Sequence, residues 1–63
     1  MSAGLKKRIE ALQALANNVA SEAQDEYYEM SETQQGSDKG QVLYDVVDHL
    51  DTARDAVDCI KLP

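Results

Sequence analysis

The residues best suited to chemistry in this sequence are five aspartates in its last third. They fall in the stretch DVVDHLDTARDAVD at steps of three or four residues. On a helix, side chains at this spacing are neighbours, with Cβ atoms about 5–6 Å apart. Such a row of carboxylates can imitate the phosphates of a nucleic-acid strand and occupy a protein that binds nucleic acid. The row consists of Asp45, Asp48, Asp51, Asp55 and Asp58.

A simpler interpretation of the aspartates is a solvated helix face that keeps the protein soluble. Aspartate is a poorer helix former than glutamate, and like charges at this spacing are mildly destabilising. A face needed only for solubility would more naturally combine glutamate with lysine. The sequence therefore leaves two uses open for the row: a solvated exterior or a surface that binds a partner.

The remaining reactive side chains are isolated. His49 lacks the Glu-x-x-His spacing of di-metal bundles, because Val46 stands three residues before it. Cys59 is the only cysteine, and no His or Asn is positioned to activate it. We expect no catalytic residue, no metal and no cofactor. Tyr27 and Tyr28 form a second candidate patch, since aromatic residues are enriched at interfaces, although a small core plug is the simpler role.

Apolar side chains indicate two helices that position these groups. They recur at alternating steps of three and four, the period that keeps one edge of a helix against a partner helix. Glycine occurs only at 4, 36 and 40, and the single proline is the last residue. We predict helices over about 3–30 and 38–61, joined by a turn over 31–37. The predicted seam comprises Leu5, Ile9, Leu12, Val19, Leu43, Val46, Leu50, Ala53, Val57 and Ile60, flanked by Leu15, Ala20, Val42, Val47 and Ala56.

Capping residues mark where the helices begin. Ser2 is placed to cap the first helix, and either Ser37 or Asp38 the second. Ser31 and Gln34 match a capping box, which indicates a short extra turn between them. Gly36 suits a left-handed position before the second helix.

A short turn makes the two helices antiparallel, so we predict an all-α hairpin in a single domain over 1–63. Its basic start, Lys6 to Arg8, would then lie beside Asp55 and Asp58. A chain of 63 residues with no Trp, no Phe and no disulfide has a marginal core. Each apolar stripe is also wider than one neighbouring helix covers. We therefore expect two hairpins to form a four-helix bundle homodimer.

The charge balance restricts the other partners. Twelve acidic and six basic residues give a net charge of −6, which opposes direct binding to nucleic acid or to anionic membranes. The sequence contains no apolar run of a membrane span or secretory signal. The single unpaired thiol, Cys59, fits a reducing compartment, so we expect a cytoplasmic protein. The favoured function is a non-enzymatic interaction or accessory protein. The alternative is an acidic mimic that inhibits a basic host protein, such as a nucleic-acid-binding or defence factor.

The stretch DEYYEMSETQQGSDKGQ (25–41), with the Leu/Ala/Val heptads after it, resembles short acidic proteins common in phage and prophage genomes. Met30, Glu32, Gln35, Gly36, Ser37 and Gly40 match their turn pattern, while Ser31 replaces the usual proline. The resemblance covers about half of the chain. It implies a hairpin that pairs into a bundle and an origin in a virus or mobile element. It implies no biochemical activity.

Overall fold

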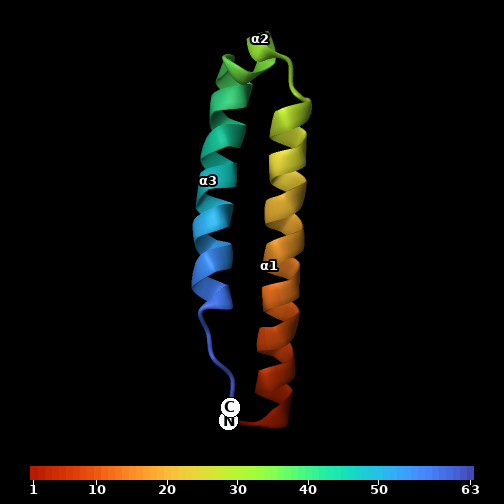
Figure 1. Cartoon of the computed structure of the whole chain (residues 1–63), viewed down its shortest axis with the longest axis vertical. Helices are drawn as coiled ribbons and strands as arrows, with labels where there is room; N and C mark the ends of the chain where they lie inside the picture. The colour runs from red at the N-terminus through yellow and green to blue at the C-terminus, as the bar shows by residue number, and fades with distance from the viewer.

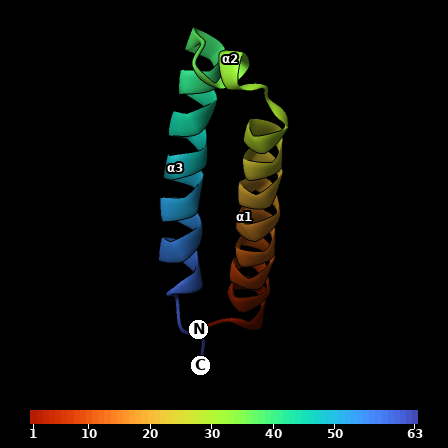
Figure 2. The same cartoon turned by 45° about the horizontal axis from the view of Figure 1, so that its top comes forward.

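The computed structural model describes all 63 residues and consists of three helices. Helix α1 covers Ala3–Glu29, α2 covers Glu32–Gln35 and α3 covers Asp38–Asp58. The two long helices run side by side in opposite directions, and both termini lie at the same end (Figures 1 and 2). The prediction of an all-helical chain is confirmed. Neither long helix has the length of apolar sequence that crossing a membrane requires.

Hydroxyl side chains begin all three helices, as expected from the sequence. The Ser2 hydroxyl accepts a hydrogen bond from the Leu5 N–H at 3.1 Å. Ser31 and Gln34 form the reciprocal capping box, with each side chain accepting from the other residue's backbone N–H. At α3 the cap is Ser37, which accepts from the Gly40 N–H at 3.2 Å. These short-range bonds fix where each helix starts.

The turn differs from the sequence-based prediction at Gly36. This residue has φ of −81° and ψ of −6°, the right-handed region, and no residue of the chain has positive φ. The left-handed assignment is therefore wrong. Most of the predicted connection forms a single helical turn, α2. The chain therefore changes direction at Ser31 and Ser37, where the backbone is extended.

Gly40 is the glycine on which the turn depends. It is buried in the first turn of α3, where α2 crosses it. A Cβ atom there would clash with the carbonyl oxygens of Gln34 and Gln35, whereas one at Gly4 would meet nothing within 4 Å. The absent side chain therefore lets α2 lie directly on α3.

Replacing Gly40 by alanine should lower the free energy of unfolding by about 1–3 kcal/mol, the usual cost of overpacking. Gly4→Ala is the matched control, because alanine is the better helix former and has open space there. Thermal unfolding followed by circular dichroism measures both. Equal melting temperatures for the two variants would contradict the packing described for α2.

Helix α3 ends at Asp58, three residues before the predicted end. The Gln13 side chain from α1 donates hydrogen bonds to the carbonyl oxygens of Val57 at 3.0 Å and Ile60 at 3.3 Å. The Val57 carbonyl oxygen also accepts from the Ile60 N–H, so Gln13 ties the end of α3 and the first residues after it to α1. Pro63 also disfavours helical conformation at the residue before it. The chain after Cys59 continues as a short tail that is neither helix nor strand.

The contact between α1 and α3 is centred on small residues. Ala20 is fully buried and Ala23 is 8% exposed, and no large side chain of the protein is buried. Ile9, Leu43, Leu50 and Val57 lie half-buried along the same line. Ala20 and Val47, predicted as flanks, lie at this contact instead, because alanine lets the two backbones approach closely. Six seam residues stay exposed in the single chain: Leu5, Leu12, Val19, Val46, Ala53 and Ile60.

Candidate protein-interaction surfaces

The hairpin has two unlike faces, and hydrogen bonds between the helices define one of them. Gln24 of α1 donates to both carboxylate oxygens of Asp51 on α3, at 2.9 and 3.0 Å. Asn17 likewise donates to Asp58 at 3.0 Å. These bonds lie beside the contact line of Ala20 and Val47, and we call this side the polar face.

The exposed apolar residues lie on the opposite side. Gln24 follows the contact residue Ala20 by four positions, and Asp51 follows Val47 by four. Val19 and Val46, in contrast, directly precede Ala20 and Val47. At about 100° per residue, both valines therefore turn away from the polar face. Two shallow hollows lie on the same side of the hairpin as these valines. One is lined by Leu5, Arg8, Ile9, Ala11, Leu12 and Leu15, and the other by Asp38, Lys39, Val42, Leu43 and Val46.

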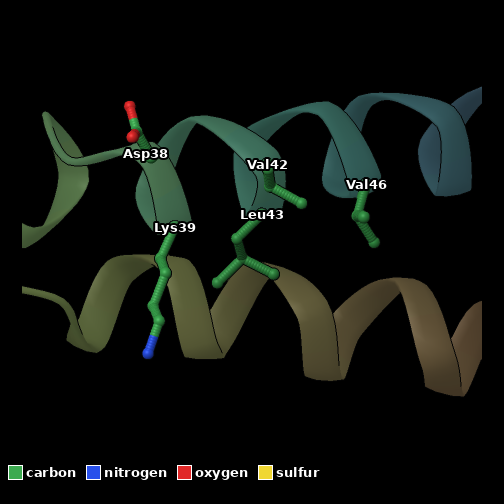
Figure 3. Close-up of a pocket in the computed structure, with 5 residues that line it drawn as sticks. All are labelled: Asp38, Lys39, Val42, Leu43 and Val46. Carbon is green, nitrogen blue, oxygen red and sulfur yellow. The ribbon is translucent and has the colours of Figure 1, made fainter.

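We call this surface the apolar face. In Figure 3, Leu43 points toward α1 and Lys39 extends across it, while Val42 and Val46 follow one another along α3. Leu15 is 58% exposed and Val42 is 65% exposed. The apolar face thus begins on the first half of α1 and ends on the first half of α3. Nothing in the single chain covers it.

On the polar face, two tyrosines and two aspartates gather in one depression. Its lining residues are Gln24, Tyr28, Tyr44, Val47, Asp48 and Asp51, and we call it the tyrosine–aspartate cleft. Tyr27 does not line the cleft but packs against both of its tyrosines. The Tyr27 ring centroid lies 6.0 Å from that of Tyr28 and 5.6 Å from that of Tyr44, and both pairs are edge to face. As whole residues, Tyr28 and Tyr44 remain 75% and 58% exposed. The candidate patch of Tyr27 and Tyr28 therefore includes Tyr44 of α3 as well.

The aspartates of the predicted row differ in what they contact. Asp51 is half-buried and is held by Gln24 and by Arg54 at 3.5 Å, so it does not belong to a fully solvated helix face. Asp58 accepts from Asn17, and Asp55 contacts Arg54 at 3.4 Å. The carboxylate of Asp48 makes no hydrogen bond or ion pair. Within the cleft, Asp48 is therefore the carboxylate free to receive a cation.

Asp45 does not line the cleft, and its contacts are with His49. Nδ1 of His49 donates to the Asp45 carbonyl oxygen at 2.8 Å and lies 3.5 Å from its carboxylate. The hydrogen bond, and then the negative charge, raise the pKa of His49 above its usual 6.5. The protonated form is thus favoured in the folded state. Any stabilisation from it is complete below pH 6.5 and is lost as the pH rises through the raised pKa.

The basic start of α1 makes none of the ion pairs expected across the hairpin. All three ion pairs of the structure lie within α3. Lys6, Lys7 and Arg8 therefore have no acidic partner in the single chain. No group of three or more His, Cys, Asp or Glu side chains is arranged to hold a metal ion.

Residues that sequence reasoning passed over complete the polar face. Gln13, Asn17 and Gln24 recur at steps of four and seven beside the buried alanines, a spacing that places them in one stripe of α1. That stripe was a readable signal for polar contacts between the helices. No protein family, curated protein or solved structure matches the chain.

Proposed function

We propose that the protein is a non-enzymatic protein-interaction module that works as a homodimer of hairpins. In this proposal the two apolar faces meet in a four-helix bundle. The two tyrosine–aspartate clefts then face outward, and each binds an arginine or lysine side chain from a protein partner. The observation that carries the proposal is the division of one hairpin into an uncovered apolar face and a polar face where an unpaired carboxylate and two exposed tyrosines line one depression.

The surface area supports pairing of the hairpins. A compact protein of 6.9 kDa is expected to expose about 4,000 Å², whereas this chain exposes 4848 Å². The excess is close to the roughly 800 Å² that each partner loses in a standard interface. A second copy is the fitting cover, because heptad-patterned helices bury a broad apolar stripe against other helices of the same kind.

The composition of the cleft supports a cationic ligand. A lysine or arginine over the face of a tyrosine is attracted by the ring quadrupole, and a nearby carboxylate adds charge attraction. Asp48 supplies that carboxylate beside Tyr28 and Tyr44. The net charge of −6 would also draw a basic partner toward the protein before contact.

A titration with short disordered peptides tests this function. We expect an arginine-containing peptide to shift the NMR signals of Tyr28, Tyr44 and Asp48 first, and a glutamate-containing peptide of equal length to shift none. Affinity should fall as salt rises, because exposed charges are screened. Shifts spread evenly over all acidic residues would show only non-specific attraction and would contradict a cleft for one cation.

The second candidate is the acidic mimic of nucleic acid. It is favoured by the row from Asp48 to Asp58, where Asp48, Asp55 and Asp58 are exposed along one helix. Arg54 counts against it, since this residue neutralises part of the row through Asp51 and Asp55. A mimic would displace nucleic acid from a basic protein in a competition assay, whereas a module that binds one side chain would not. The resemblance to phage proteins makes a bacterial host protein the first partner to test.

A further inference from the structure

The two ends of the hairpin carry opposite charges. Lys6, Lys7 and Arg8 lie in the first turns of α1, at the end where both termini meet (Figure 1). Glu26, Glu29 and Glu32 lie at the other end, beside the turn. None of these six charges takes part in an ion pair within the chain. Each end therefore matches the opposite end of another copy.

We infer that two hairpins pair in opposite directions through their apolar faces, with α1 against α1, so that Arg8 of each copy contacts Glu26 of the other. This arrangement rests on the proposed homodimer and specifies its geometry. In a parallel pair the basic ends would lie together, and so would the acidic ends. Like charges held side by side are destabilising.

The spacing along α1 favours the same pairing. Arg8, Leu15, Val19 and Glu26 follow one another at steps of seven, four and seven, which places them on one side of the helix. The four positions are spaced symmetrically about residue 17, so their spacing is unchanged when the helix is turned end for end. Leu15 of one copy then meets Val19 of the other, and each arginine meets a glutamate.

Leu5 and Leu12 lie beside this series on the apolar face and are also exposed. End-for-end pairing brings them toward the second half of the partner's α1, where Val19 is exposed. A two-fold interface requires a patch that is complementary to itself, and α1 carries one.

Cross-linking between chains of two kinds tests the direction of pairing. Cys59, which is exposed, is first replaced by serine. One chain then carries Arg8→Cys and the other Glu26→Cys, and the mixture is treated with a short thiol cross-linker. We expect the mixed product to dominate over both products of like chains. In a parallel dimer the two cysteines would be about 27 Å apart along the helices, and like chains would cross-link instead.

Charge exchange gives an independent measurement. Arg8→Glu and Glu26→Arg each weaken self-association, but the two variants mixed should associate about tenfold more tightly than either alone. Sedimentation of the unmodified protein separates the two proposals. A monomer would contradict the homodimer itself. A dimer that cross-links only between like positions, or gives no gain on mixing, would overturn the opposed arrangement alone.

Discussion

Replacing Leu15 by aspartate should convert the dimer into a monomer that is poorly helical at micromolar concentration. Leu15 is 58% exposed in the single hairpin and lines the hollow of the apolar face. In the dimer each copy buries it, which contributes about 1.5–3 kcal/mol per leucine. An unpaired carboxylate at the centre of the interface costs several kcal/mol more. The dissociation constant should therefore rise by more than about a hundredfold.

Ala14→Asp is the matched control, because it adds the same charge one residue earlier, at an exposed position away from the apolar face. Sedimentation should show this variant unchanged in mass, and circular dichroism should show its helix content retained. Leu50→Asp provides the severe case, since Leu50 lies half-buried between the helices of one hairpin. It should unfold the chain outright. Identical behaviour of the variants at 14 and 15 would show that the apolar face has no partner.

Combining Tyr44→Ala with Asp48→Asn should weaken binding of an arginine-containing peptide by about tenfold. The tyrosine face and the carboxylate each contribute about 0.5–1 kcal/mol at exposed positions. Both side chains lie in the tyrosine–aspartate cleft, and Asp48 has no partner within the chain. Fluorescence anisotropy of a labelled peptide measures the loss, and an unchanged circular dichroism spectrum shows that the fold survives.

A second variant separates the cleft from the overall charge. Asp25→Asn with Glu29→Gln removes two charges from exposed positions of α1 outside the cleft. It should reduce peptide affinity by less than the cleft variant does, although it removes two negative charges from the protein and the cleft variant removes only one. If both variants weaken binding equally, then the peptide is attracted by the overall negative charge of the protein and the cleft is not its binding site.

Local features of the fold were predictable from the sequence, whereas the packing line between the helices was not. The caps at Ser2 and Ser31 depend on residues within three positions, so they can be read directly. The heptad pattern contains two adjacent rows, one through Leu5 and Leu12 and one through Ile9, Ala16 and Ala23. Periodicity alone does not say which row meets the neighbouring helix. The structure selects the alanine row, because small side chains permit the closest approach.

The candidate site shows a similar division. The sequence identified Asp48, Tyr27 and Tyr28 as possible contact residues but treated aspartates and tyrosines as separate patches. They meet because the turn sets Tyr27 level with Tyr44, and Tyr44 is one helical turn from Asp48. That register depends on α2 packing over Gly40, a contact between segments that local patterns do not reveal. The roles of Gln24 and Arg54 in holding Asp51 follow from the same register.

The central claim is that the apolar face of one hairpin is covered by another copy. Sedimentation equilibrium of the unmodified protein at micromolar concentration tests it most directly. We predict a single species of twice the 6.9 kDa chain mass, with dissociation and loss of helix content occurring together on dilution. A cooperatively melting, fully helical species of 6.9 kDa would contradict the claim.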